Sequence, residues 1–193
     1  LVHDHEITFY RYGSAHQECL AHVVRYLKDS MENESSLTWN RRMRELLQRM
    51  IHYRKEHTGE ASLDAQTVAG FETEYQEILD KAKEEYKRNE PSPYYREGYN
   101  LYRRMQEYKT EHLLFLHDMR VPTTNNTAER CLRDYKRKQT FAMTFRSLES
   151  IEELYHSKGV LLEVRKNNPN IYTAVMEIFN RRYGALSLIH ISE

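Results

Sequence analysis

The 193-residue chain contains 29 Lys plus Arg and 29 Asp plus Glu, so its formal net charge is zero and it is neither a polybasic arm nor an acidic tail. No stretch approaches the ~20 apolar residues of a membrane span, and the two cysteines, Cys19 and Cys131, are too few for a disulfide framework. These features predict a soluble protein of the reducing cytoplasm, in which any contact with nucleic acid is local.

The first thirty residues differ in pattern from the rest of the chain. Residues 1–4 are predicted to end a strand, and residues 6–12 contain β-favouring and aromatic side chains that leave strand and helix open. From Cys19 the pattern becomes helical, with Leu20, Val23 and Leu27 on one side. Because the chain begins at Leu1 rather than Met, we also expect an incomplete copy of a longer protein.

Three amphipathic helices are predicted between residues 36 and 116, because apolar residues recur there with the helical period. The first covers residues 36–57 and ends before Gly59, and the second covers residues 68–86 and ends before Pro91. The third begins at Ser92 and Pro93 and continues to Leu116 as one helix. The sequence therefore predicts a mostly helical centre.

Three more helices are predicted after Pro122. The first spans about residues 126–138, and the second spans about residues 148–166, where Ser150 and Glu153 have the spacing of a capping box. Asn168 and Pro169 are predicted to open the last one. Residues 185–193 (ALSLIHISE) shift abruptly to an apolar pattern, which we interpret as a non-native tail, with a native edge strand as the alternative.

The segment that follows Pro122 carries the strongest chemical pattern. Ala128, Cys131, Leu132 and Tyr135 share one face of the predicted helix and are expected to be buried, while Glu129 lies at the flank of that face. Between residues 130 and 146 Asp134 is the one acid, and the basic side chains are Arg130, Arg133, Lys136, Arg137, Lys138 and Arg146. This local basic patch is a candidate DNA contact or a solvated helix face.

Glu129 has two interpretations on spacing alone. Asn126 and Glu129 have the spacing of a capping box, and a glutamate in a first helical turn is favoured by the helix dipole. A catalytic interpretation needs a second acid from elsewhere in the chain.

Several blocks of sequence, in order, resemble an insertion-sequence-66-type transposase. The blocks are His3-Asp4-His5 with Tyr10 and Gly13, residues 16–27 (HQECLAHVVRYL), Thr38-Trp39-Asn40 with Met43 and Leu46-Leu47, Asn125-Asn126-x-Ala128-Glu129-Arg130-x-Leu132-Arg133, Lys136 with Gln139, and Phe145-Arg146-Ser147. The resemblance extends from residue 1 to about residue 182 and is much more specific than a single motif.

The resemblance implies a DDE-type transposase catalytic region of the α+β class, with a partial ribonuclease-H-like core and a long helical insertion. The fragment given by the 193 residues would be mostly helical. Residues 1–30 would belong to the core, residues 31–120 to the insertion and residues 121–184 to the C-terminal part of the core. Asp4 would be the second catalytic aspartate and Glu129 the closing glutamate, and both would bind metal. The implied cofactor is a pair of Mg²⁺ or Mn²⁺ ions, which activate the attacking oxygen and stabilise the leaving one.

The resemblance also implies binding partners and a further catalytic aspartate upstream of Asp4. The partners are transposon-end and target DNA, bound by the basic patch, and other copies of the chain in a homo-oligomer, in the cytoplasm of a bacterial or archaeal cell. The family's first catalytic aspartate lies on a strand upstream of Asp4, so we expect this fragment to be inactive alone. An uncovered apolar face on the Glu129 helix further predicts partial disorder or aggregation.

Other interpretations remain beside this one. The sequence also suits a noncatalytic helical DNA-binding or protein-interaction module, whose DNA affinity would depend on salt and not on metal. Cys19 and His22 share a helix face, but the sequence offers no convincing second half of a zinc site, so they are assigned, with Asn125 and Asn126, to structural or active-site-proximal roles. Tyrosines at 94, 95, 99 and 102 alternate with arginines, which suits either base stacking or core packing, and we prefer packing.

Overall fold

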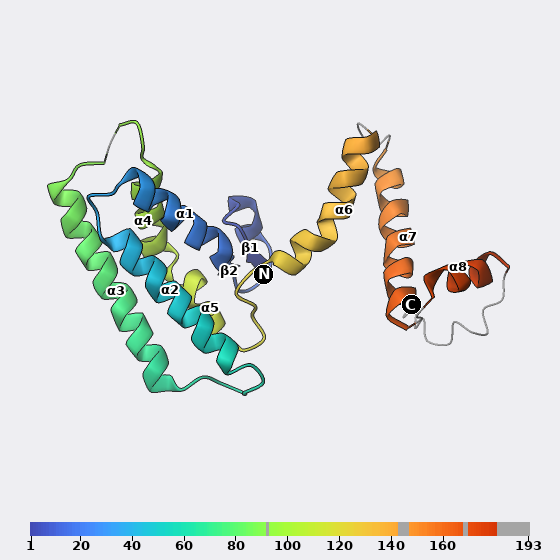
Figure 1. Ribbon diagram of the computed structural model, residues 1–193, viewed down its shortest axis with the longest axis horizontal. Helices are drawn as coiled ribbons and strands as arrows, with labels where there is room; N and C mark the ends of the chain where they lie inside the picture. Colours follow the sequence, from blue (N-terminus) through green and yellow to red (C-terminus); the bar gives the residue numbers. More distant parts are fainter. Residues whose placement is uncertain (92, 143–146, 168–169, 181–193) are drawn as a thin grey trace. The chain divides into compact units, whose positions relative to one another are not determined.

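The computed structural model in Figure 1 describes residues 1–91, 93–142, 147–167 and 170–180. The chain divides into two compact units, Leu1–Arg130 and Cys131–Glu193. The boundary falls inside helix α6 (Asn126–Ala142). The described residues are mostly helical, in agreement with the helical part of the predicted fold class.

The first unit begins with a small parallel sheet. Strand β1 (Val2–His3) pairs with strand β2 (Gln17–Glu18), with Val2 opposite Gln17 and His3 opposite Glu18. The strand predicted to end near Asp4 is therefore present, whereas β2 was not predicted. The segment between the strands forms a 3₁₀ helix, η1 (Ile7–Arg11), rather than a strand, and Glu6 caps it by accepting a hydrogen bond from the Thr8 amide.

Three helices follow the sheet and pack side by side. Helix α1 (Leu20–Asn33) packs against α2 (Trp39–Glu56), which packs in turn against α3 (Ala65–Arg88) (Figure 1). Asp64 caps α3 by accepting a hydrogen bond from the Thr67 amide. Gly59 adopts a φ of 102°, a left-handed conformation that favours glycine and ends α2 as predicted.

The predicted apolar stripes form the core of this unit. Trp39 and Tyr75 are fully buried at its centre. The stripe residues that the structure buries are Leu20, Val23, Leu27, Trp39, Met43, Leu46, Leu47, Met50, Val68, Tyr75, Ile78, Leu79, Ala82, Tyr86, Leu101, Tyr102, Met105, His112, Leu113 and Leu116. Burial of these side chains supplies the hydrophobic free energy that holds the three helices together.

The third predicted helix is in fact two helices. Helix α4 (Glu97–Glu107) begins after Arg96, later than the predicted start, and α5 (Lys109–His117) follows it after a break at Tyr108. Tyr108 leaves helical geometry, with φ −108° and ψ 35°, and its ring packs against His5 and Tyr10. The apolar period crosses the break without interruption, so the prediction of a single helix was wrong.

The second unit consists of helices in its described part. The C-terminal turns of α6 precede α7 (Leu148–Asn167) and α8 (Ile171–Phe179). Ser147, rather than the predicted Ser150, is the cap of α7, because its Oγ accepts a hydrogen bond from the Ser150 amide at 3.2 Å. Asn170 caps α8, while Asn168, Pro169 and residues 185–193 lie outside the described residues.

Candidate active site

The carboxyl edge of the two-stranded sheet brings together several predicted site residues. Asp4 is exposed and follows β1 directly, where the strand register places it beside Cys19. The Cys19 amide donates a hydrogen bond to the His3 carbonyl at 2.7 Å and so continues the pairing at this edge. His5 has a φ of 69°, which turns the chain sharply away immediately after Asp4.

The segment that leads to Glu129 is tied to the same edge. The Leu20 amide, at the start of α1, donates a hydrogen bond to the Thr123 carbonyl at 3.0 Å. In the first turn of α1, His22 Nε2 lies 3.7 Å from Glu129 Oε1. These two interactions therefore hold residues 123–129 against the start of α1, which is the element that follows β2.

The capping-box interpretation of Glu129 finds no support in the geometry. Helix α6 begins at Asn126, and the Glu129 amide donates to the backbone carbonyl of Asn125. The Glu129 carboxylate faces His22, and the Asn125 side-chain oxygen is buried without a hydrogen-bond partner among the described residues. An unpaired buried oxygen is costly unless something outside the chain satisfies it.

The donor atoms at this edge suit a hard divalent cation. Asp4 and Glu129 offer carboxylate oxygens, and Asn125 offers an unpaired amide oxygen. Mg²⁺ prefers oxygen ligands, retains several waters and takes only one or two protein carboxylates. The types of these residues therefore suit the cation that the family resemblance implies, although no cluster of three or more His, Cys, Asp or Glu side chains with metal-binding geometry occurs in the described part of the chain.

Cys19 and His22 have different environments. Cys19 is fully buried as a free thiol at the junction of β2 and α1, as expected of a small apolar side chain. His22 is largely buried, with Nε2 toward Glu129, and its Nδ1 finds no hydrogen-bond partner in the part of the chain that the structure describes. Among the described residues, no third His, Cys, Asp or Glu completes a metal site with Cys19 and His22, so the geometry does not support a zinc site here.

Sequence reasoning missed a buried ionic network beneath this edge. Glu18 on β2 is 1% exposed, and its Oε1 contacts His5 Nδ1 at 2.6 Å and the Tyr10 hydroxyl at 2.9 Å. Its Oε2 lies 3.1 Å from His112 Nε2 and 3.3 Å from Arg104 Nε. Although burial by itself raises a carboxyl pKa, the contacts with His112 and His5 and the Arg104 charge hold the pKa of Glu18 well below its ordinary range.

This network joins the sheet to the helices that follow it. His112 on α5 also pairs through Nδ1 with the Tyr75 hydroxyl at 2.9 Å, and Tyr75 lies on α3. Gln17, beside Glu18, accepts a hydrogen bond from the Phe115 amide at 2.8 Å. The one signal in the sequence was the polar pair Gln17-Glu18 immediately before an apolar helix face.

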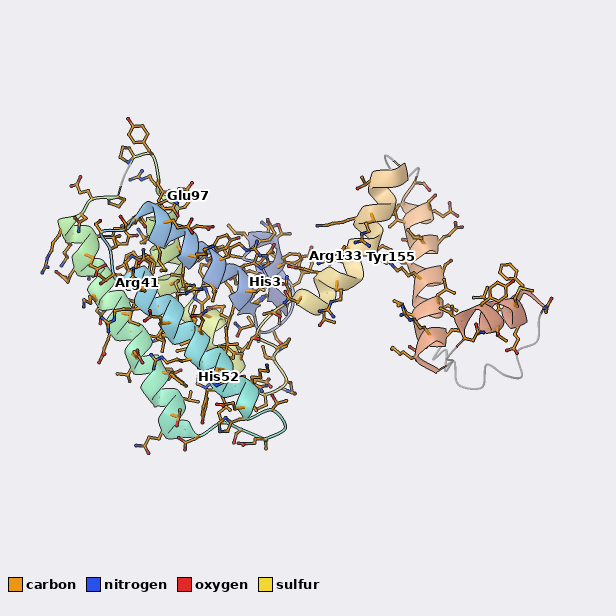
Figure 2. All side chains as sticks on the ribbon, in the orientation of Figure 1. His3, Arg41, His52, Glu97, Arg133 and Tyr155 are labelled. Carbon is orange, nitrogen blue, oxygen red and sulfur yellow. The ribbon has the colours of Figure 1, made fainter. Side chains whose placement is uncertain are left out.

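The predicted DNA-contacting residues lie along α6. Arg130 is exposed in the first unit, and Lys136 and Arg137 are exposed in the second. Arg133, also in the second unit, is exposed as well (Figure 2). The Lys138 side chain and Arg146 lie outside the described residues. Ala128 is exposed and Leu132 is 44% exposed, so the expectation that these two form a buried stripe was wrong, while the side chains of Cys131 and Tyr135 are not described.

One comparison with known proteins gives a match. Residues 3–153 match the model of a family described as "Transposase IS66 family". No curated protein and no solved structure matches the chain. None of the helices described in the structure combines the length and the apolar character that a membrane crossing needs.

Proposed function

The chain belongs to the IS66 transposase family, and from this membership we propose that it takes part in metal-dependent cleavage and strand transfer of DNA during transposition of an insertion sequence. Asp4 and Glu129 are the proposed catalytic carboxylates. Two observations support the assignment: Asp4 directly follows β1, and Glu129 lies 3.7 Å from His22 in α1, the helix that directly follows β2.

The chemistry requires these residue types. Two divalent ions about 3.5–4 Å apart stabilise the attacking and leaving oxygens of an in-line displacement at phosphorus. Asp4 and Glu129 would hold the Mg²⁺ or Mn²⁺ ions by their carboxylates, and the Asn125 amide oxygen is a further candidate donor. We propose that the parallel strands β1 and β2, with Asp4 after the first of them, belong to a partial ribonuclease-H-like core.

The proposed site is shared with a third acid. Family resemblance assigns the first aspartate to a strand that precedes the Asp4 strand, and we propose that the 193-residue chain does not cleave DNA alone. The exposed cations of α6, namely Arg130, Arg133, Lys136 and Arg137, are the proposed phosphate contacts for transposon-end and target DNA. A homo-oligomer is the proposed active form.

A cleavage assay on the transposase that contains this chain together with its upstream aspartate tests the proposal. Transposon-end DNA is incubated with Mg²⁺ and, separately, with EDTA. Asp4→Asn and Glu129→Gln should each abolish nicking while leaving DNA binding in EDTA unchanged, because they remove metal ligands and no phosphate contact. Glu84→Gln, an exposed carboxylate paired with Lys87 on α3, is the matched control and should retain activity.

Two results would overturn the proposal. Full nicking by either active-site variant would remove Asp4 or Glu129 from the catalytic site. DNA binding that depends on salt, with no nicking in any metal, would favour the noncatalytic DNA-binding module instead.

A further inference from the structure

A basic cavity of about 410 Å³ lies between the C-terminal half of α3 and helix α4. This volume falls within the ~300–1,000 Å³ range typical of small-ligand pockets. The cavity is built wholly from the first unit and is separate from the edge that carries Asp4. Its lining consists of Lys83, Tyr86, Lys87, Pro91, Arg96, Tyr99, Tyr102, Arg103 and Gln106.

The charge of this lining is entirely positive. It includes four cations and no acid, in a chain whose net charge is zero. Lys87 pairs with Glu84 at 2.6 Å, whereas Lys83, Arg96 and Arg103 have no ion-pair partner among the described residues. Unpaired exposed cations around a concavity attract an anion, because the low-dielectric wall concentrates their field.

The base of the cavity is aromatic. Tyr86 and Tyr102 are buried, with ring centroids 5.4 Å apart, and Tyr99 lies 5.1 Å from Tyr86 and 5.9 Å from Tyr102. Tyr99 is partly exposed at the edge of this cluster. Packing explains the two buried rings, as the sequence pattern suggested, but it leaves the open part of Tyr99 beside the cations unexplained.

A larger cavity of the same unit provides a contrast. Its volume is about 650 Å³, and it lies between α1 and α4 beside His5. Asp29 and Glu97, the latter labelled in Figure 2, contribute carboxylates to its wall, and the one arginine of its lining, Arg104, already contacts Glu18. This larger cavity therefore disfavours a phosphate, and the smaller basic cavity is the one that suits an anion.

We propose that the basic cavity binds one unpaired nucleotide of a DNA strand, with Lys83 and Arg103 at its phosphate and Tyr99 against its base. Cations around an aromatic surface are the general means by which proteins hold single-stranded nucleic acid, since every base has a stacking face. An unpaired nucleotide is required because a base inside a duplex has no free face for Tyr99. The choice of DNA over RNA rests on the proposed function.

Fluorescence anisotropy on the 193-residue chain tests the charge part of this proposal. The probe is a labelled single-stranded DNA of about ten nucleotides, titrated in EDTA at several salt concentrations. Lys83→Ala/Arg103→Ala should weaken binding about tenfold and reduce the salt slope by about 0.7 for each phosphate that the variant no longer neutralises. The matched control is Lys81→Ala/Arg41→Ala, which also removes one lysine and one arginine, but from exposed positions outside the cavity. Arg41 is labelled in Figure 2. This control should change the affinity for the strand less than about twofold.

A second pair of variants tests stacking. Tyr99→Phe keeps the ring and should bind as the unmodified chain does, while Tyr99→Leu keeps apolar bulk but loses the ring and should bind at least about fivefold more weakly. Because Tyr99 also packs on the core, urea midpoints are measured for both variants. An ultraviolet crosslink between a 5-iodouracil-containing strand and residues 96–106 gives a readout that does not depend on substitution.

The outcomes separate the cavity from the proposed function. Equal weakening by the cavity variant and the matched control, equal binding of the same sequence as a duplex, or equal affinities of Tyr99→Phe and Tyr99→Leu would each overturn the cavity proposal. None of these results tests the proposed catalytic roles of Asp4 and Glu129, because the binding assay contains no metal. Conversely, loss of the catalytic assignment would leave strand binding by the cavity intact.

Discussion

Replacement of Glu18 by glutamine should destabilise the first unit strongly. The side chain is 1% exposed and contacts Arg104, which is 16% exposed, and His112, which is fully buried. Glutamine keeps the shape and an acceptor oxygen but removes the charge, so the Arg104 guanidinium loses the anion that compensates its burial. Removal of one partner from a buried pair costs about 3–5 kcal/mol, and we expect a loss of about 3 kcal/mol because the amide retains some hydrogen bonding.

Urea denaturation, followed by circular dichroism and Trp39 fluorescence, measures this loss. A reduction of about 3 kcal/mol is a large part of the ~5–15 kcal/mol by which single domains are stable. The double variant Glu18→Gln/Arg104→Gln should lose less than the sum of the two single variants, because it leaves no uncompensated charge. Glu84→Gln, in an exposed pair on α3, is the control and should leave the midpoint unchanged.

The same network predicts a dependence on pH. The pKa of Glu18 in the folded chain lies below its ordinary value of 4.5, so the stabilisation is fully present above pH 4.5 and is lost as the pH falls below that value toward the folded pKa. The difference in stability between the unmodified chain and Glu18→Gln should therefore be constant near pH 7 and narrow below pH 4.5. A loss under about 1 kcal/mol at pH 7, or a difference that does not change with pH, would refute the reasoning.

Three further predictions concern the helices. Gly98→Ala should destabilise by about 1–3 kcal/mol, because the new Cβ would collide with the Glu34 carboxylate and displace it from Ser30 and Tyr86. Gly70→Ala, with open space around it on α3, should instead stabilise by about 0.4–1 kcal/mol; urea midpoints decide, and equal effects would contradict the close approach of Gly98 to Glu34. Trp39→Ala should cost about 3–5 kcal/mol by the same measurement, because Trp39 is fully buried, and a loss below 1 kcal/mol would place it outside the core. Asp64→Ala should lower the thermal midpoint at pH 7 while Asp64→Asn retains most of it; since hydrogen bonds from Thr67 lower the pKa of Asp64 below its ordinary 3.8, the effect of Asp64→Ala should fade as the pH drops below that value, and an effect independent of pH would argue against the cap.

The sequence predicted correctly those helices that bury a single apolar face. The stripe from Trp39 to Met50 and the stripe from Val68 to Tyr86 both appear on buried faces, because the 3.6-residue period of apolar side chains directly reports the face that leaves water. The same period could not predict the break between α4 and α5 at Tyr108. It depends on ring packing with His5 and Tyr10, which lie about a hundred residues earlier in the chain.

The candidate site could be predicted only in part from the sequence. Asp4 and Glu129 are proposed as site residues from blocks of family resemblance, since spacing alone favoured a helix cap for Glu129. The contact between His22 and Glu129 joins residues that are distant in sequence, and the Glu18 network gathers partners from η1, α4 and α5. A buried carboxylate on a two-residue strand has no periodic signature, so only the folded chain reveals it.

We propose that Asp4 and Glu129 belong to one metal site, and a crystal structure of the chain grown with Mn²⁺, in which anomalous scattering locates the ions, is the decisive experiment. We expect anomalous peaks at the carboxyl edge of the sheet, with oxygens of both Asp4 and Glu129 bound to one ion or to a pair of ions about 3.5–4 Å apart. Carboxylates that lie on opposite sides of the first unit, or Mn²⁺ bound elsewhere with Asp4 and Glu129 uninvolved, would contradict it.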